Sequence, residues 1–357
     1  MNTDWLLELE STVKAVFQKP LGGGVVECGV CERRCRIPPG GRGACGNRVN
    51  LDGTLYNIGY GLLSALESRP IEIKPFFHFW PGSTAMTFSG YGCNMYCPWC
   101  QNYHLSFNKP DPKLHSYTPP EKVVEKALAY RDEGVCASFN EPTIHLEYLL
   151  DVFTLASKKG LYSTIVSNGY MSIESLKAMA NAGLDALNID IKGCPKTYSS
   201  HLHRLDPKIV FRNAVKALEI GLHVEMVFLV VTGANDEDDC IDWVLRNHVE
   251  LLGEEVPLHV NRYYPAHKYL KPPTDIDLLV KIYNKAKSMG IKYVYVGNIW
   301  DPSYEATYCP SCGETLIYRL HYRSLDVRLG TNNSCPKCGQ KIPIRGKIVL
   351  KRRRFLI

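Results

Sequence analysis

The stretch GYGCNMYCPWCQN, residues 90–102, gathers three cysteines within eight residues: Cys93, Cys97 and Cys100. It follows the apolar segment TAMTFSG (84–90), whose length and composition are typical of a buried strand. Thiolates are the usual ligands of iron–sulfur clusters, and a four-iron cube normally takes one cysteine for each iron. Three cysteines therefore leave one iron with an open coordination position, which is typical of a site for chemistry rather than for structure.

A zinc site with an incomplete ligand set is the competing interpretation of this loop. His104 lies four residues after Cys100 and would be the nearest further donor. Hydrolytic zinc sites are built mainly on histidine and carboxylate ligands, so three closely spaced thiols favour the cluster. The histidines within strand or helix patterns are expected to be hydrogen-bonded structural residues rather than ligands; these are His145, His223 and His259.

The chain between residues 80 and 300 alternates apolar segments of strand length with longer amphipathic segments that end at or near a glycine, as helices often do. Such short connections predict parallel strands with right-handed crossovers. We therefore expect an α/β fold, a partial (β/α)6-type barrel, with the three-cysteine loop after its first strand. In such folds the chemistry lies at the carboxyl ends of the strands. The expected strands are 84–90, 135–139, 162–167, 186–191, 224–231, 257–262 and 292–297, and the expected helices are 119–134, 143–160, 172–183, 209–221, 236–253 and 275–290.

Composition places the chain among globular proteins, with 45% hydrophobic and 22% charged residues. The net charge of +6 permits an anionic partner without requiring one. No apolar run approaches the roughly 20 residues that span a bilayer, and the first ten residues, MNTDWLLELE, lack the basic and apolar regions of a signal peptide. We therefore expect a cytoplasmic protein without membrane association, whose fourteen cysteines stay reduced.

Two groups of four cysteines flank the barrel segment, and clustered reduced cysteines indicate metal ligands. The C-terminal group has two Cys-x-x-Cys turns, which predict a tetrahedral four-sulfur site for zinc or, as in rubredoxin, iron. The N-terminal group is less regular; zinc is the first interpretation and a second iron–sulfur cluster is the next. The expected organisation is an N-terminal Cys-rich metal-binding element (1–79), the barrel (80–300) and a C-terminal zinc-ribbon-like or rubredoxin-like module (301–357). The N-terminal ligands are Cys28, Cys31, Cys35 and Cys45, and the C-terminal ligands are Cys309, Cys312, Cys335 and Cys338.

The spacing Cys93-x-x-x-Cys97-x-x-Cys100, with Trp99 before the last cysteine, resembles the radical S-adenosylmethionine superfamily. More specifically, the chain resembles the radical enzyme of the AmmeMemoRadiSam system, a relative of the activating enzymes of pyruvate formate-lyase. This resemblance spans nearly the full length. It also rests on CERRCRIPPGGRGACGNRVNLDGTLYNIGYG (31–61), FNEPTI (139–144), VSNGYM (166–171), NIDIKG (188–193), YVYVGN (293–298) and the C-terminal YCPSCG and CPKCG turns.

The resemblance implies a [4Fe-4S] cluster whose open iron binds the amino and carboxylate groups of S-adenosylmethionine. Reductive cleavage would give methionine and a 5′-deoxyadenosyl radical, which removes a hydrogen atom from a substrate that the sequence does not identify. A protein substrate, as for an activase, is one candidate. The resemblance further implies an electron donor of the flavodoxin or ferredoxin type and a partner among the other proteins of the AmmeMemoRadiSam system.

The resemblance also assigns residues around the cofactor. Glu141 would accept a hydrogen bond from the ammonium group of S-adenosylmethionine, although this chain has Asn140-Glu141 where the superfamily usually has Gly-Gly-Glu. Alternatively, Glu141 is an acid that stabilises the start of a helix before Pro142. The other expected contacts are Ser167 and Asn168 at the ribose or carboxylate, Lys192 at the methionine carboxylate, Asp190 at the ribose or at Lys192, and Trp99 over the cluster or the adenine.

A nucleic-acid-binding or RNA-modifying protein that docks through its zinc modules is the alternative function. The segment KRRRFLI (351–357) places four basic residues beside the C-terminal module. The sequence shows no stacking platform or recognition helix with it, so we do not expect nucleic acid as the partner.

Overall fold

The computed structural model describes residues 4–349 of the chain. Its centre is an eight-stranded sheet with the strand order β14-β13-β12-β11-β10-β9-β8-β7. Strands β8 to β14 pair in parallel, and β7 pairs antiparallel with β8 at one edge. The strands are β7 (Ala65–Pro70), β8 (Thr84–Ser89), β9 (Gly134–Ala137), β10 (Tyr162–Ser167), β11 (Ala186–Ile191), β12 (His223–Val230), β13 (Leu258–Arg262) and β14 (Val294–Gly297).

Each of the seven strands expected from the sequence is present within about two residues of its expected bounds. The α/β class with a parallel sheet is thus confirmed, while the closing of this sheet into a partial barrel stays a prediction. Strand β7 was not expected, because ALESRP alternates too weakly to indicate a strand.

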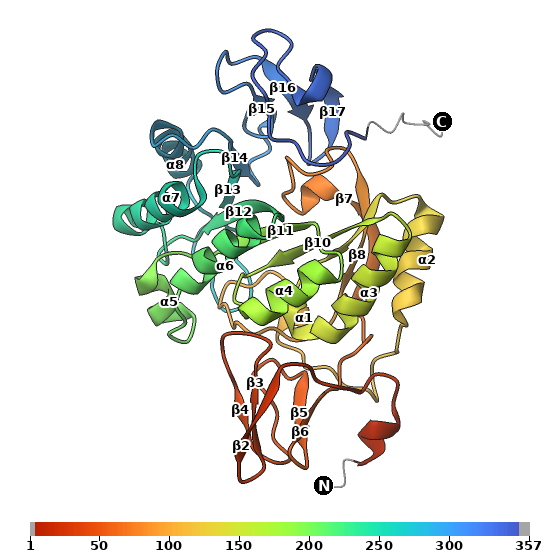
Figure 1. The fold of residues 1–357 in the computed structure, drawn as a ribbon. Coiled ribbons are helices and arrows are strands. Elements are labelled where there is room, and N and C mark those ends of the chain that lie inside the picture. Colours follow the sequence, from red (N-terminus) through yellow and green to blue (C-terminus); the bar gives the residue numbers. More distant parts are fainter. Residues whose placement is uncertain (1–3, 350–357) are drawn as a thin grey trace.

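Helices connect the parallel strands and line one face of the sheet (Figure 1). Their ends follow local chemistry: Ser172 accepts a hydrogen bond from the Ser175 amide at the start of α4, and Asp275 does the same for Asp277 at the start of α8. The helices are α1 (Tyr103–Ser106), α2 (Pro120–Tyr130), α3 (Leu146–Lys158), α4 (Ile173–Asn181), α5 (Pro195–His201), α6 (Lys208–Glu219), α7 (Asp238–Leu252) and α8 (Ile276–Ser288), with short 3-10 turns η1 (Asp4–Glu8), η2 (Ile71–Ile73), η3 (Pro142–His145), η4 (Pro302–Tyr304) and η5 (Thr331–Asn333). The six expected helices are confirmed; α1 and α5 are too short to show a periodicity.

Two small β structures lie at opposite ends of the central sheet (Figure 1). The N-terminal one contains the sheets β2-β3-β4 and β1-β6-β5, and it lies near the carboxyl ends of the parallel strands. The C-terminal one contains the sheet β15-β16-β17 and packs at the amino ends of the parallel strands. Their strands are β1 (Val13–Lys14), β2 (Gln18–Gly22), β3 (Val25–Cys28), β4 (Arg36–Ile37), β5 (Arg48–Leu51), β6 (Thr54–Asn57), β15 (Thr307–Tyr308), β16 (Thr315–Arg319) and β17 (Ser324–Val327).

Two sequence expectations concern partners outside the fold. Among residues 4–349, no helix has both the length and the apolar character that crossing a bilayer requires. The basic segment 351–357, on which the nucleic-acid alternative depends, lies outside the described residues.

A buried carboxylate joins the amino ends of β12 and β13 to the chain before β8. Glu225 accepts hydrogen bonds from the Phe77 and His78 amides at 3.0 and 2.8 Å, and it contacts the Nε2 atoms of His223 and His259 at 3.0 and 2.7 Å. Burial alone would raise the pKa of Glu225, but the two histidine contacts outweigh burial and hold this pKa well below its usual value. His223 and His259 are therefore hydrogen-bonded structural residues, as predicted.

Glu225→Gln should lower the free energy of unfolding by about 3 kcal/mol, because the amide group turns a donor toward groups that themselves donate. Chemical denaturation at pH 7 measures this loss. Since the folded-state pKa is depressed, the contribution of Glu225 is complete above the ordinary carboxyl value of about 4.3 and disappears as the pH falls through the folded-state pKa. The exposed Glu219→Gln variant is the control, and equal losses in both variants would contradict this role.

Candidate functional site

A large cavity opens at the carboxyl ends of β8, β9, β10 and β11, with about 990 Å³ of empty volume. We call it the cysteine-loop cavity, because the loop between β8 and α1 forms one of its walls. All the catalytic and cofactor-binding residues expected from the sequence line it except Trp99; they are Cys93, Cys97, Cys100, Asn140, Glu141, Ser167, Asn168, Asp190 and Lys192. Parallel pairing explains this convergence, since it brings the carboxyl ends of neighbouring strands to one edge.

The Sγ atoms of the three loop cysteines do not all lie within 4.8 Å of one another. Among the described residues, three or more potential ligand atoms lie within 4.8 Å of one another only in the C-terminal cysteine group. A cluster differs from a single ion because each thiolate binds a different iron, so its ligands stand farther apart. Burial raises the pKa of the Cys97 thiol to about 11, with Lys192 acting in the opposite direction, so binding of a metal here would displace a proton. The donor set of the loop therefore fits an iron–sulfur cluster.

Glu141 is buried where β9 leads into η3, and its carboxylate orders the neighbouring strand end. It accepts hydrogen bonds from the Thr143 amide at 3.1 Å, from the Ser167 hydroxyl at 2.8 Å and from the Asn168 amide at 2.8 Å. Burial raises the pKa of Glu141, and these hydrogen bonds oppose the increase. Glu141 thus caps η3, which is the structural alternative that the sequence left open, and at the same time lines the cavity.

The end of β11 contributes an ion pair to the cavity. Lys192 Nζ lies 2.8 Å from Asp190 Oδ2, and the Lys192 amide donates to the Tyr198 hydroxyl at 3.3 Å. Burial would lower the pKa of Lys192, but Asp190 and the Cys97 thiol together raise it above its usual value. The ammonium group therefore stays charged and presents a fixed positive charge at the cavity wall.

Lys74 and Phe139 also line the cavity and were not expected from the sequence. Lys74 is 4% exposed, and its Nζ lies 3.7 Å from the centroid of the Phe139 ring. Burial lowers the pKa of Lys74. Phe139 itself has a φ of +72°, a strained conformation of the kind found at functional sites. The signal for Lys74 was present, because a lysine in the apolar stretch IEIKPFF (71–77) needs a partner.

Trp99 lies beneath the loop rather than at the cavity surface. Its ring is 2% exposed and packs edge-on against His201 and Tyr269, with centroid distances of 5.6 and 5.5 Å. These contacts fix the loop on α5 and on the segment after β13. A position over the cluster or the adenine stays a prediction.

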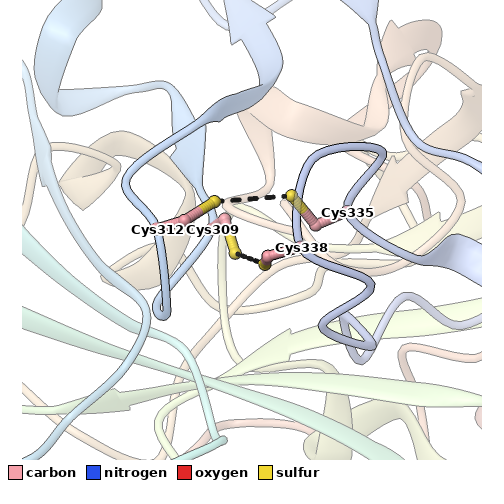
Figure 2. A group of neighbouring side chains, drawn as sticks. All are labelled: Cys309, Cys312, Cys335 and Cys338. Atoms are coloured by element: carbon pink, nitrogen blue, oxygen red, sulfur yellow. Dashed lines mark hydrogen bonds between the residues drawn. The ribbon is translucent and has the colours of Figure 1, made fainter.

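The C-terminal cysteine group forms a compact four-sulfur site (Figure 2). The Sγ atoms of Cys309 and Cys338 are 3.5 Å apart, and those of Cys312 and Cys335 are 3.7 Å apart. Four thiolates at about 2.3 Å around a tetrahedral ion would stand about 3.8 Å from one another. The geometry therefore fits one metal ion and confirms the predicted C-terminal group.

The N-terminal cysteines Cys28, Cys31, Cys35 and Cys45 line a second, separate cavity with about 350 Å³ of empty volume. We call it the N-terminal cavity. It lies on the other side of the three-cysteine loop, because Asn94 lines it while Cys93 and Met95 line the cysteine-loop cavity.

Comparison with known proteins gives one family match and one relative of similar length. Residues 87–244, which run from β8 through α7, match the family model of the radical SAM superfamily. This segment of the chain therefore resembles a radical SAM domain. Over 334 residues it is 37% identical to the uncharacterized protein MJ0808 of Methanocaldococcus jannaschii, covering 93% of this chain and 99% of that one.

Solved structures show more distant likeness. Streptococcus suis SuiB bound to S-adenosylmethionine is 11% identical with a TM-score of 0.47; the alignment covers 62% of this chain and 50% of SuiB, so this chain spans about half of that protein's length. A domain of the pyruvate-formate lyase-activating enzyme from Bacteroides vulgatus is 14% identical with a TM-score of 0.40, over 46% of this chain and 99% of that domain.

Replacing Cys312 and Cys335 together by serine should release one metal ion per chain, because two ligands of a tetrahedral site are lost. Strands β15 to β17 should then exchange their amide hydrogens rapidly, since a small metal module depends on its ion for folding. Elemental analysis and hydrogen–deuterium exchange measure the two effects. The double variant Cys194→Ser/Cys240→Ser is the control, and an unchanged metal content in the first variant would contradict a metal site.

Proposed function

We propose that this protein reductively cleaves S-adenosylmethionine at a [4Fe-4S] cluster in the cysteine-loop cavity and uses the resulting 5′-deoxyadenosyl radical to remove hydrogen from a substrate. The observation that carries this proposal is the meeting of three thiols, a buried carboxylate and a charged lysine around one cavity. When bound, such a cluster supplies the single electron that splits the sulfonium cofactor. The chain supplies the cluster ligands, positions the cofactor and provides the charged groups that pair with the charges of the cofactor.

In this proposal the two ends of the methionine moiety meet groups of opposite charge. Cys93, Cys97 and Cys100 hold the cluster and leave one iron for the cofactor. The Lys192 ammonium neutralises the methionine carboxylate, and Glu141 pairs with the ammonium group, which would bring the raised pKa of Glu141 back down. Asp190 keeps Lys192 charged and oriented.

Polar groups at the end of β10 complete the cofactor site. Ser167 and Asn168 are held by Glu141 at the cavity wall and present hydroxyl and amide groups for the ribose or the carboxylate. Asn140 is 8% exposed and its Oδ1 atom is buried without a hydrogen-bond partner, so this oxygen offers an acceptor in the same cavity.

The finer assignment is also a proposal. The segments 31–61, 139–144 and 293–298 support membership among the radical enzymes of the AmmeMemoRadiSam system, which are related to glycyl-radical activases. The substrate class that accompanies this assignment is a protein, and the electron donor is a flavodoxin or ferredoxin. For the compact C-terminal site we propose zinc, with iron as the second choice.

Anaerobically reconstituted protein with dithionite and S-adenosylmethionine should produce 5′-deoxyadenosine and methionine, which chromatography with mass detection measures. Cys97→Ala should abolish this production and remove about four irons per chain, because the cluster loses one of three ligands. The matched control is Cys240→Ala, a buried cysteine that does not line the cavity. Full production by the Cys97→Ala variant would refute the proposed site.

Lys192→Met should weaken binding of S-adenosylmethionine about tenfold or more, because a hydrogen bond between charged groups contributes roughly 1.5–3 kcal/mol. Equilibrium dialysis of the reconstituted protein measures the dissociation constant. Lys196→Met is the control, since Lys196 lies four residues on and pairs with Glu237 at the surface. Equal affinities of the Lys192→Met variant and the unaltered protein would exclude Lys192 from cofactor binding.

A further inference from the structure

The N-terminal cavity is built by a hairpin that turns its cysteines inward. Cys28 ends β3, and its amide donates to the Cys35 carbonyl at 2.9 Å, which closes the turn before β4. Cys31 is fixed to the segment after β10, since it pairs as an isolated bridge with Met171. Cys28 and Cys31 are 7% and 8% exposed. The four thiols thus surround a shielded space.

The spacing of these thiols differs from that of the C-terminal group in the same chain. The C-terminal sulfurs are within 4.8 Å of one another, as one tetrahedral ion requires, whereas no three of the N-terminal sulfurs meet this limit among the described residues. This wider arrangement fits a polynuclear centre, in which each thiolate binds its own iron.

Unpaired hydrogen-bond donors provide independent support. Arg48 is 1% exposed and lines the N-terminal cavity; its Nη2 atom donates to Glu147 at 2.9 Å, and its guanidinium group also interacts with the Cys28 thiol. Its Nε and Nη1 atoms are buried and have no oxygen or nitrogen partner, and neither has Nδ2 of Asn94 on the same cavity. An unsatisfied buried donor costs roughly 1–3 kcal/mol, so such groups normally face an acceptor. The sulfides and thiolates of an iron–sulfur cluster are anionic acceptors of this kind.

We propose that Cys28, Cys31, Cys35 and Cys45 hold a second iron–sulfur cluster, which transfers electrons to the cluster site of the cysteine-loop cavity. From the sequence alone, zinc is the first interpretation for these cysteines. The distances between the thiols and the unpaired donors favour an iron–sulfur cluster over zinc. The electron-transfer role rests on the proposed function, whereas the presence of the second cluster does not.

A single backbone segment separates the two cavities. Asn94 faces the N-terminal cavity, and its neighbours Cys93 and Met95 face the other. The segment is held from both sides: Arg33 Nη1 donates to the Asn94 carbonyl at 2.9 Å, and Asn168 Nδ2 donates to Asn94 Oδ1 at 2.7 Å.

Gly92 shows how closely the N-terminal element approaches the loop. Gly92 has a φ of +92°, and a Cβ atom there would lie 2.3 Å from the Cys45 carbonyl oxygen. One electron from a flavodoxin or ferredoxin would enter the N-terminal cluster and pass across the loop; the donor is oxidised by one electron, the second site is reduced by one, and no bond forms or breaks.

The direct test uses the full chain with Cys93, Cys97 and Cys100 all replaced by alanine, which leaves the N-terminal cavity unaltered. After anaerobic reconstitution with iron and sulfide, this variant should hold about four irons and four sulfides per chain and give an electron paramagnetic resonance signal on reduction with dithionite. Adding Cys28→Ser and Cys31→Ser should remove them. Zinc in place of the four irons, or about four irons that survive the serine substitutions, would overturn the second cluster.

If the triple variant does not fold, the iron content and the paramagnetic resonance signals of the unaltered protein test the second cluster. It should hold about eight irons per chain in its two clusters and show two signals on reduction, of which S-adenosylmethionine changes one. A content of about four irons with a single signal would overturn the proposal. The two proposals can also fail separately. If the triple variant retains its iron but the unaltered protein does not cleave S-adenosylmethionine, the proposed function is refuted and the second cluster is still supported.

The electron-transfer role is tested with Cys28→Ser/Cys31→Ser alone. Reduction of the remaining cluster by flavodoxin hydroquinone, followed by stopped-flow absorbance, should be slower than in the unaltered protein, while dithionite should still reduce it. Equal flavodoxin rates in both proteins would overturn this role.

Discussion

Parallel strand pairing is the constraint on which the rest of this structure depends. Strands β8 to β11 run in one direction, so the residues that follow them emerge at one edge of the sheet. Residues far apart in the chain, Cys93, Glu141 and Lys192, meet there without any local sequence relation between them. The core below the edge is tightly buried, which holds the strand ends in place and lets loops carry the chemistry.

The site combines charges of both signs in a setting that is largely shielded from water. Glu141 is satisfied by hydrogen bonds from its own neighbours, and Lys192 is satisfied by Asp190. Each of these groups therefore already has polar partners within the fold. Such preorganisation suits the proposed chemistry, in which the cofactor performs the difficult step and the protein supplies position and electrostatics.

Sequence reasoning succeeded where a pattern is repeated or chemically specific. The alternation of strands and glycine-terminated helices predicted every parallel strand, and the Cys-x-x-Cys turns predicted the C-terminal site. It failed where a property arises only from folding. The β7 edge strand has no strong alternation, and the cavity position of Lys74 depends on how the chain before β8 folds back.

The distances between thiols also arise only from folding, and they separate the compact C-terminal group from the other two cysteine groups. The central claim is that the cysteine-loop cavity holds a cluster with one iron open to S-adenosylmethionine. Electron–nuclear double resonance of the reduced protein with cofactor labelled by ¹⁵N at its amino group tests this most directly. The account predicts a hyperfine coupling between that nitrogen and the cluster. A cluster signal without such a coupling, although the cofactor is bound, would contradict it.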